Sequence, residues 1–392
     1  MDRDWEDLGQ QWEVRSGTTY LNHGSFGLPP KPVRDSRSEW IQKLNEQPMD
    51  FFVRQLETHV DRVLTRLGEF LGTERSNLVF ADNATYAMNV VADGFPLKAG
   101  DEVLLNDHEY GAVHRIWARR CQRTDAAVVT ATLPAVFESS QQVLDCLFEH
   151  VNQKTKLMVV SHITSPTAVI LPVEEICREA QARGIAVCID GPHALAQVDV
   201  NLNELGCDFY TASCHKWLCA TLGSGFLYAS PKWHEFMEPI NKSWGRLLPA
   251  LPEHWTEEFT WSGTRDVSAF LSIETAIEFM ESIGIQSFQN RSRYLTRYVR
   301  GQLEAKLGTE AIVPDDHAWY GSMAQVPLPD AANGYPELQH RLWEKHQIEV
   351  PIIELNDRWY VRVSAHLYNS QNQMDRLIES LEDCLSECGS VN

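Results

Sequence analysis

Three residues with reactive side chains are consecutive in the stretch TASCHKWLCATLGSG, residues 211–225. They are Cys214, His215 and Lys216, and a second cysteine, Cys219, follows on the same stretch. A zinc site requires roughly two to four soft ligands at fixed spacing, such as two cysteines separated by two residues. Cys214 and Cys219 do not have that spacing, and no partner pair is apparent in the sequence. The pattern therefore disfavours a metal and directs attention to the lysine.

Lys216 follows a predicted strand, residues 207–213, and would stand at the carboxyl end of that strand. Burial lowers the pKa of a lysine amine, and a neutral amine can form a Schiff base. Pyridoxal phosphate requires such a lysine, together with an acid for its pyridine nitrogen and a cradle for its phosphate. The two other parts can be sought at neighbouring strand ends.

Asp190 is a candidate for the acid, because it ends the apolar run IAVCID, residues 185–190. A carboxylate at the end of a buried strand costs several kcal/mol unless it has a cationic or donor partner. It either caps the turn that Gly191 and Pro192 begin, or it accepts a hydrogen bond from a protonated ring nitrogen. Both interpretations stay open at this point.

The stretch FADNATYAMN offers a candidate phosphate cradle. Asn83 has the residue type of a helix N-cap, and Ala84 and Thr85 would be the first helical positions. Their free backbone N–H groups and the threonine hydroxyl form a ready anion site. Taken alone, this motif is explained better by a plainly capped helix. The sequence thus offers all three parts, each at the end of a predicted strand.

The elements that must position these residues alternate along the chain. Apolar runs predict strands over residues 77–82, 101–107, 125–133, 155–163, 185–190 and 207–213. Amphipathic segments predict helices over residues 84–95, 111–121, 139–151 and 173–184. Such alternation is typical of an α/β fold with a mostly parallel central sheet and helices on both faces. Ligands of such sheets bind at the carboxyl ends of the strands.

The pattern changes after about residue 270. Long helices are predicted over residues 269–284 and 288–308, and a last helix over 372–385, with strand-like runs at 311–314, 321–328, 348–353 and 359–365. We therefore predict a large cofactor-binding domain, residues 25–270, and a smaller α+β C-terminal domain, residues 271–392. An N-terminal segment, residues 1–24, would pack near the active site.

Composition narrows the classes of function. The chain has 392 residues, 43% of them apolar, and a net charge of −20. Such a charge repels nucleic acid and anionic membrane, so neither is an expected partner. No apolar run reaches the roughly 18–20 residues of a membrane span, and the acidic N-terminus has no signal-like apolar region. Nine scattered cysteines indicate reduced thiols in a cytoplasmic setting. Cys384 and Cys388 fit a helix that carries two thiols better than a metal or disulfide site.

Several motifs together identify a known family. The stretches DGPHALAQVDVNLNELGCDFYTASCHKW, SHITSPTAVILPV and RVSAHLYNS resemble the class V aminotransferases, pyridoxal-phosphate enzymes of fold type I with the aspartate aminotransferase-like architecture. The resemblance runs from about residue 20 to residue 377. Within the family, YLNHGSFGLPP, NATYAMN, DHEYGA and WSGTRD resemble the isopenicillin N epimerase branch most.

The resemblance implies a role for each residue around the cofactor. Lys216 would hold pyridoxal phosphate as a Schiff base, and Asp190 would keep the pyridine nitrogen protonated. His193 would donate a hydrogen bond to the phenolic oxygen, and Tyr110 would stack on the ring. The phosphate would be held by four residues, Ala84, Thr85, Ser213 and His215.

The resemblance also implies a homodimer with shared active sites and an amino-acid substrate. Thr264 would reach the phosphate of the neighbouring subunit. Arg362 would bind the substrate carboxylate, with Ser25 and His23 contributing to the substrate site. Either Tyr110 or His23 could be the second acid that faces Lys216.

The implied reaction begins when Lys216 removes the Cα proton of the substrate. Return of a proton from the opposite face gives epimerisation, which is the predicted activity. A C–S lyase that eliminates a β-substituent and a transaminase are the alternatives within the family. A desulfurase that uses a loop cysteine is disfavoured, because no cysteine lies between Cys219 and Cys384.

Overall fold

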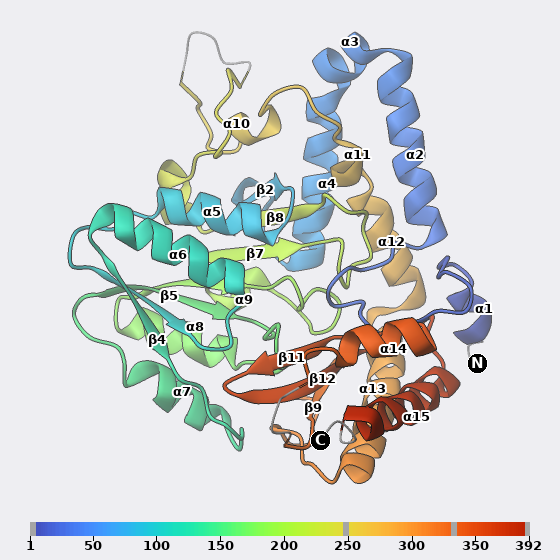
Figure 1. Cartoon of the computed structure of the whole chain (residues 1–392). Helices are drawn as coiled ribbons and strands as arrows, with labels where there is room; N and C mark the ends of the chain where they lie inside the picture. Colours follow the sequence, from blue (N-terminus) through green and yellow to red (C-terminus); the bar gives the residue numbers. More distant parts are fainter. Residues whose placement is uncertain (1–4, 246–250, 331–334, 389–392) are drawn as a thin grey trace.

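The computed structural model describes residues 5–245, 251–330 and 335–388, apart from the side chain of Cys388. A central sheet has seven strands in the order β2-β8-β7-β6-β5-β3-β4. The strands are β2 (Leu78–Ala81), β3 (Glu102–Asn106), β4 (Ala127–Ala131), β5 (Thr155–Ser161), β6 (Ala186–Asp190), β7 (Phe209–Ser213) and β8 (Gly225–Ala229). Figure 1 shows this sheet in the large part of the molecule, with the C-terminal part below it.

The sheet is mostly parallel, as predicted, and one of its strands was not predicted. Strands β3 to β7 pair in parallel, whereas β8 runs antiparallel to both of its neighbours, β2 and β7. Antiparallel neighbours do not need a crossover helix between them. The chain therefore passes from β7 to β8 through a loop, without the helical segment that follows the other strands. This loop carries Lys216.

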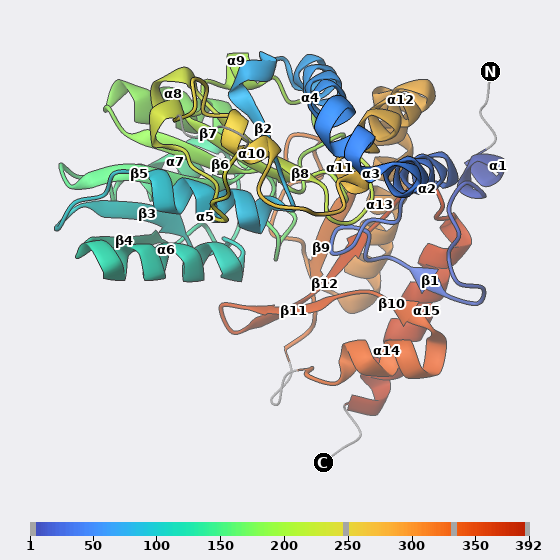
Figure 2. The same cartoon turned by 90° about the horizontal axis from the view of Figure 1, so that it is seen from above.

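Each face of the sheet carries its own layer of helices. Along β6, Val187 and Ile189 belong to one core cluster, whereas Ala186 and Cys188 belong to the other. Side chains of a strand alternate between faces, so a sheet covered on both sides needs apolar residues throughout. Helices α5 (Ala84–Gly94) and α6 (Gly111–Thr124) cover one face, and α7 (Ser140–Phe148) and α8 (Val173–Ala182) cover the other (Figure 2).

Most of the remaining helices extend the second face or connect the two parts of the molecule, whereas the short helices Pro231–Phe236 and Glu257–Thr260 pack on the first face. They are α1 (Trp5–Gly9), α2 (Lys31–Glu46), α3 (Pro48–Asp50), a π-helical turn (Phe51–Gln55), α4 (Leu56–Leu71), two 3₁₀ turns (Arg75–Asn77 and Pro231–Phe236), α9 (Leu202–Leu205), α10 (Glu257–Thr260), α11 (Ser268–Leu271) and α12 (Ile273–Ile283). Helix α12 packs against both α2 and α4.

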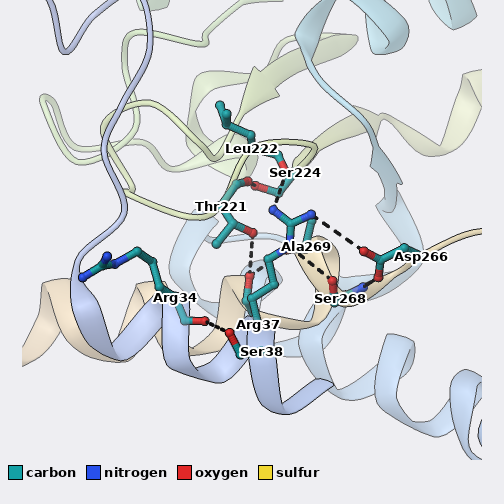
Figure 3. A network of polar contacts seen from close by, with 10 residues as sticks. Arg34, Arg37, Ser38, Thr221, Leu222, Ser224, Asp266, Ser268 and Ala269 are labelled. Carbon is teal, nitrogen blue, oxygen red and sulfur yellow. Dashed lines mark hydrogen bonds and ion pairs between the residues drawn. The ribbon is translucent and has the colours of Figure 1, made fainter. Parts of the chain in front are cut away.

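A polar network fixes the loop between β7 and β8 from outside. Figure 3 shows Arg37 of α2 reaching the backbone oxygen of Leu222, with Ser268 and Asp266 on its other side. The backbone oxygen of Thr221 accepts a hydrogen bond from the Ser224 hydroxyl at 2.6 Å. These contacts tie the far side of the Lys216 loop to α2 and to the segment that leads into α11.

The C-terminal part is built on a small antiparallel sheet in the order β11-β12-β9. Its elements are α13 (Ile285–Leu307), β9 (Met323–Pro327), α14 (Leu338–His346), β10 (Ile348–Glu349), β11 (Ile352–Leu355), β12 (Arg358–Ser364) and α15 (Gln371–Cys388). Strand β1 (Thr19–Tyr20) pairs in parallel with β10. The start of the chain is therefore joined to its end, which Figure 1 shows as blue beside red.

Two predictions of the C-terminal elements are wrong in detail. Residues 311–314 form no strand. The helix predicted over residues 269–284 is two helices, α11 and α12, with Ser272 between them. Among the described residues, no helix is long and apolar enough to span a membrane.

Candidate active site

A cavity of about 340 Å³ lies where the carboxyl ends of β5, β6 and β7 meet the N-termini of α5 and α6. Its lining comes from six separate stretches of chain and the C-terminal part: Gly24, Ser25, Phe26, Asn83, Ala84, Thr85, Met88, Tyr110, Ala112, Val113, Ile116, Ser161, Ile163, Ser165, Asp190, Pro192, His193, Ser213, His215, Lys216 and Arg362. Asp190 is the single carboxylate in this lining. The cavity can therefore attract anions although the whole chain is strongly negative.

Lys216 stands just beyond β7, with its amine 3.2 Å from Nε2 of His193. Burial lowers the pKa of Lys216 to about 8, with a further lowering by Arg362 and an opposing effect of Asp190. The amine therefore carries an available lone pair in about one molecule in ten at pH 7, far more often than an ordinary lysine. Such an amine can attack a carbonyl and can accept a proton from carbon.

The hydrogen bonds of His193 define which of its nitrogens carries the hydrogen. Nε1 of Trp217, which is always a donor, lies 3.3 Å from Nδ1 of His193. Burial lowers the pKa of His193 well below its usual range, so the ring is neutral. Nε2 then carries the hydrogen and points it at Lys216. The same N–H could serve a phenolate oxygen of a group held by Lys216.

Asp190 ends β6 inside the cavity and is buried. One of its carboxylate oxygens accepts a hydrogen bond from the Thr211 hydroxyl at 2.7 Å. Burial raises the pKa of Asp190 to about 6, against the lowering effects of Thr211 and Lys216. A buried carboxylate of this kind is stabilised by a protonated partner, which a pyridinium nitrogen would provide.

The residues predicted as a phosphate cradle lie together, at the N-terminus of α5 and the end of β7. The backbone N–H of Ala84 donates to the Ser213 hydroxyl oxygen at 2.9 Å. Asn83 caps the helix, because its side-chain oxygen accepts a hydrogen bond from the Tyr86 N–H at 2.9 Å. Thr85 lines the same part of the cavity and is exposed to it. Helix N-terminal N–H groups and hydroxyls favour a phosphate.

His215 completes this side of the cavity. Its Nδ1 lies 3.2 Å from the backbone oxygen of Ser224 and donates to it. Burial lowers the pKa of His215 to about 4, with a further lowering by the neighbouring Lys216. A phosphate beside the ring would act in the opposite direction and favour the charged imidazolium.

Arg362 of β12 lies in the lining of the cavity and is 3% exposed. It donates to the backbone oxygen of Ser165, to the Ser25 hydroxyl at 3.0 Å and to the Asn22 side-chain oxygen at 3.4 Å. Its Nε has no hydrogen-bond partner. Burial lowers the pKa of Arg362 to about 10. A buried guanidinium with a vacant donor is suited to bind a substrate carboxylate.

The structure brings most of the predicted site residues together around this cavity. Those that line it are Ser25, Ala84, Thr85, Tyr110, Asp190, His193, Ser213, His215, Lys216 and Arg362. Tyr110 is the N-cap residue of α6, lines the cavity and is 52% exposed. The roles of these residues remain predictions.

Two predicted residues do not line the cavity. His23 is fully buried behind Lys216, with Nδ1 2.9 Å from the Tyr368 hydroxyl and Nε2 3.0 Å from the Lys216 backbone oxygen. Because both of its nitrogens are engaged there, His23 is not placed to donate a proton into the cavity. Thr264 is exposed and lies outside the lining.

The cysteines that opened the sequence question are packed away from the cavity lining. Cys214 and Cys219 are both fully buried, and burial raises the pKa of each thiol well above its usual value. Neither is therefore a reactive thiolate. Cys214 belongs to the hydrophobic core.

A buried acid beside the cavity was missed. The Glu109 carboxylate accepts hydrogen bonds from the Ser161 backbone N–H at 2.8 Å and from the Ser161 hydroxyl at 2.6 Å. The Asn106 side chain donates to it as well, at 2.5 Å. Burial raises the pKa of Glu109 to about 8. Its position between a strand end and Tyr110, in NDHEYG, was the available signal. It holds the start of α6, and with it Tyr110, to the end of β5.

Comparison with known proteins places this constellation in a family. The sequence model of the family "Aminotransferase class-V" matches residues 28–377. The chain belongs to this family. It is accordingly an enzyme that uses pyridoxal phosphate, and the predicted fold type and cofactor are confirmed.

Relatives of this class V enzyme have more than one activity. Isopenicillin N epimerases from Amycolatopsis lactamdurans and Streptomyces clavuligerus are 33% and 31% identical to it, over 97% and 98% of this chain and 98% and 99% of theirs. A putative L-cysteine desulfhydrase from Oryza sativa subsp. japonica is 27% identical over 95% of this chain and 84% of its own. A solved structure of a C-DES mutant, with glycine covalently linked to the cofactor, has a TM-score of 0.84 at 18% identity, and the match covers 95% of this chain and 98% of that chain.

The residues of the cavity fit pyridoxal phosphate. The Lys216 amine, the buried Asp190 carboxylate and the N-terminus of α5 all line one cavity. When bound, the cofactor supplies a carbonyl for amines and a ring that accepts electrons. The same cavity holds Arg362, so an amino acid can be bound by its carboxylate beside the lysine.

Proposed function

We propose that this class V enzyme changes the configuration at the Cα of an amino-acid substrate, as an epimerase or racemase. The proposal is carried by the match to two isopenicillin N epimerases over nearly the whole chain. It is supported by the cavity lining, which offers Lys216 and the phenol of Tyr110 as two proton-transfer groups. Epimerisation needs such a pair, because a proton leaves one face of Cα and another arrives on the opposite face.

In this proposal the strand-end residues hold the cofactor. Lys216 would bond to it until the substrate amine takes the place of the lysine, and the freed Nζ would then accept the Cα proton. Asp190 accepts a hydrogen bond from the ring nitrogen, and His193 donates through Nε2 to the phenolic oxygen. The phosphate is held by Ala84, Thr85, Ser213 and His215.

The substrate is oriented from the other side of the cavity. Arg362 binds its carboxylate through the guanidinium, and Ser25 holds that guanidinium in place. Tyr110 stacks on the cofactor ring and carries the second proton. Of the two candidates for this acid, Tyr110 is retained because His23 faces the Lys216 backbone instead.

We further propose a homodimer and a three-part division of the chain. Thr264 would contact the phosphate of the partner's site, which agrees with its exposure outside this chain's cavity. Phe26 and Tyr110, at the cavity mouth, are 66% and 52% exposed and would be covered by a partner. Residues 1–24, 25–270 and 271–392 would be the N-terminal segment, the large domain and the small domain.

The proposal is tested by incubating the holoenzyme with a panel of L- and D-amino acids and small peptides in deuterium oxide. Incorporation of deuterium at Cα, followed by NMR, together with formation of the opposite configuration is the expected result. A panel in which no compound exchanges its Cα hydrogen would contradict the proposal. Lys216→Ala protein is the control for exchange without the enzyme.

A second candidate is C–S lyase activity, which the similarity to an L-cysteine desulfhydrase favours. In this case the carbanion formed at Cα would lose a sulfur substituent from Cβ. Two rates measured with cysteine would distinguish the activities: release of sulfide and pyruvate, and exchange of the Cα hydrogen in cysteine that keeps its sulfur. A faster release than exchange would support the lyase over the epimerase. A desulfurase that uses a persulfide stays disfavoured, because residues 220–383 contain no cysteine.

A further inference from the structure

The segment of residues 22–27, NHGSFG, touches the guanidinium of Arg362 and the backbone of Lys216, the two residues whose charged groups the proposed reaction uses. Toward Arg362, Ser25 and Asn22 both accept hydrogen bonds from one guanidinium nitrogen, at 3.0 and 3.4 Å. Toward the lysine, His23 contacts the backbone oxygen of Lys216. The segment itself is joined to the end of β12 through a bridge between Asn22 and Ser364. It is therefore a physical link between the substrate side and the lysine side of the cavity.

The hydrogen-bond geometry defines the tautomer of His23. A backbone carbonyl can only accept, so Nε2 of His23 must carry a hydrogen for its 3.0 Å contact with the Lys216 oxygen. Burial lowers the pKa of His23 to about 4, so the ring is neutral and Nδ1 is an acceptor. Nδ1 then receives the hydroxyl hydrogen of Tyr368, 2.9 Å away. Tyr368 thus orients the ring that holds the Lys216 peptide.

The same peptide is enclosed on a second side. Gly27 lies so close to it that a β-carbon there would be 2.4 Å from the His215 oxygen and 2.6 Å from the Lys216 oxygen. The Lys216 oxygen also accepts the Cys219 backbone N–H at 3.0 Å, which closes a turn. Cys219 has a φ of 59°, a left-handed conformation that is uncommon for a residue with a side chain. The turn after Lys216 is therefore held in place by its surroundings.

A metal is the alternative explanation for this cluster. His23, Cys219 and His366 offer one ligand atom each, all within 4.8 Å of one another. The two imidazole rings are stacked, however, with centroids 4.1 Å apart and 15° between their planes. Lone pairs of stacked rings run side by side and do not converge on one ion at the distances that zinc requires. The stacked arrangement favours hydrogen bonding over metal binding.

We propose that His23, oriented by Tyr368, is a positioning residue that fixes the Lys216 peptide, and that residues 22–27 thereby couple the lysine to Arg362. The inference rests on the proposed role of Lys216 as the cofactor lysine. It assigns His23 a function different from that of the second acid. Its consequence is that changes at His23 alter how the bound cofactor is held, even without substrate.

The test compares two amides of similar polarity, His23→Asn and His23→Gln, in the holoenzyme. The glutamine amide nitrogen can reach the place of Nε2 and donate to the Lys216 oxygen, whereas the shorter asparagine can reach only the place of Nδ1. We expect the Asn variant to bind pyridoxal phosphate about tenfold more weakly than wild type and the Gln variant to stay within about twofold. The pH midpoint of the bound cofactor's absorbance should move in the Asn variant alone.

Thermal unfolding of both apoproteins controls for folding, which the absorbance midpoint does not report. The proposal would be overturned if both variants lost cofactor affinity equally. It would also be overturned if both variants kept the wild-type affinity and the wild-type pH midpoint of absorbance. Stoichiometric zinc in the purified wild type that both variants lose would overturn it as well. If neither variant folds, Tyr368→Phe is used instead. A pH midpoint of the cofactor absorbance identical to that of the wild type would then contradict the proposal that Tyr368 orients His23.

The role of Lys216 is checked separately, by borohydride reduction and mass spectrometry of the wild type and of Lys216→Ala. A covalent cofactor adduct that persists in Lys216→Ala would refute the proposed role of the lysine. That result is distinguishable from failure of the His23 proposal, in which the adduct on Lys216 forms normally and only the His23 variants behave differently from expectation.

Discussion

The cavity has two walls of different origin. The strand-end wall consists of Ala84, Asp190, Ser213 and Lys216, from elements that follow one another in the large sheet. The chain-end wall consists of Ser25 and Arg362, which are 337 positions apart in sequence and meet through one hydrogen bond. The first wall has the donors, the acid and the amine that a cofactor requires, and the second has the cation that a substrate carboxylate requires.

The difference between the walls separates two tasks. A cofactor that stays bound can be held by a rigid sheet edge, where each strand end has a fixed neighbour. A substrate that enters and leaves is met by residues from the two ends of the chain. Damage to the strand-end wall should therefore appear in cofactor binding, and damage to the chain-end wall should appear in substrate affinity with the cofactor retained.

The largest effect is expected for Lys216→Met in the strand-end wall. Loss of the amine should lower activity by about 10⁴-fold or more, since it removes both the covalent bond and the proton acceptor. The apoprotein should become more stable near neutral pH, on the order of 3 kcal/mol. Chemical denaturation of wild-type and variant apoproteins measures this.

The sign of that stability effect follows from the pKa of Lys216, which is lowered to about 8 in the folded protein from an ordinary value of 10.5. The unfolded chain binds the proton more tightly, so the buried lysine destabilises the fold fully below pH 8 and not at all above about 10.5. The gain in the Met variant should shrink as the pH rises through this range. If the gain in unfolding free energy does not depend on pH, it comes from packing of the methionine and not from removal of the buried charge.

The next largest effect is expected for Arg362→Gln in the chain-end wall. Loss of a buried charged partner of the substrate carboxylate should lower kcat/KM by about 10² to 10³-fold. At high pH, where the Lys216 amine is neutral in both proteins, binding of pyridoxal phosphate should change less than about twofold, because the strand-end wall is intact. Steady-state kinetics and cofactor titration on the same preparation measure both. Ser25→Ala is the matched control, with an expected loss of only about fivefold.

These two walls also explain how much the sequence could predict. Asp190, Asn83 and Lys216 each stand at or just after the end of an apolar run that predicts a strand. The local pattern alone therefore placed them at the edge of the sheet where the strands have their carboxyl ends. The role of Arg362 came from the resemblance to the family. No periodicity shows that residue 362 meets residue 25, because a contact over that distance leaves no local pattern.

His23, which was predicted to belong to the substrate site but does not line the cavity, shows the same limit of sequence-based prediction. Its neighbours Ser25 and Phe26 do line the cavity, yet the turn between them directs the His23 ring backwards onto the Lys216 peptide. Strand β8 was missed for a related reason, since its antiparallel partners need no helix in between. Glu109 was missed because its acceptor role depends on Ser161, which belongs to another strand.

A pH effect of about tenfold should reveal how the two walls interact. The apoprotein should bind pyridoxal phosphate covalently at a rate that rises about tenfold from pH 7 to pH 9, because only the neutral Lys216 amine attacks the aldehyde. The increase should level off above the Lys216 pKa of about 8. Stopped-flow absorbance of the reconstitution reaction measures it.

The chain-end wall should contribute to that midpoint. Arg362 lowers the pKa of Lys216 through its positive charge. In Arg362→Gln the midpoint of the reconstitution rate should therefore move to higher pH, although the cofactor affinity measured at high pH stays the same. A midpoint that does not move would show that burial alone lowers the lysine pKa, and the walls would then be electrically independent.

The smallest effect is expected for Ser213→Ala. The serine hydroxyl oxygen accepts the Ala84 N–H, so its loss leaves one N–H of the α5 terminus without its partner and removes one donor to a phosphate. A neutral hydrogen bond of this kind contributes about 1 kcal/mol, which corresponds to about fivefold weaker cofactor binding. At saturating cofactor, the KM for the amino acid should equal that of the wild type. Thr85→Val tests the neighbouring hydroxyl in the same assay, and two additive losses are expected if both hydroxyls contact the phosphate. A Ser213→Ala protein that binds the cofactor normally but has a raised KM for the amino acid would contradict the separation of tasks between the walls. A residue of the strand-end wall would then contribute to substrate binding.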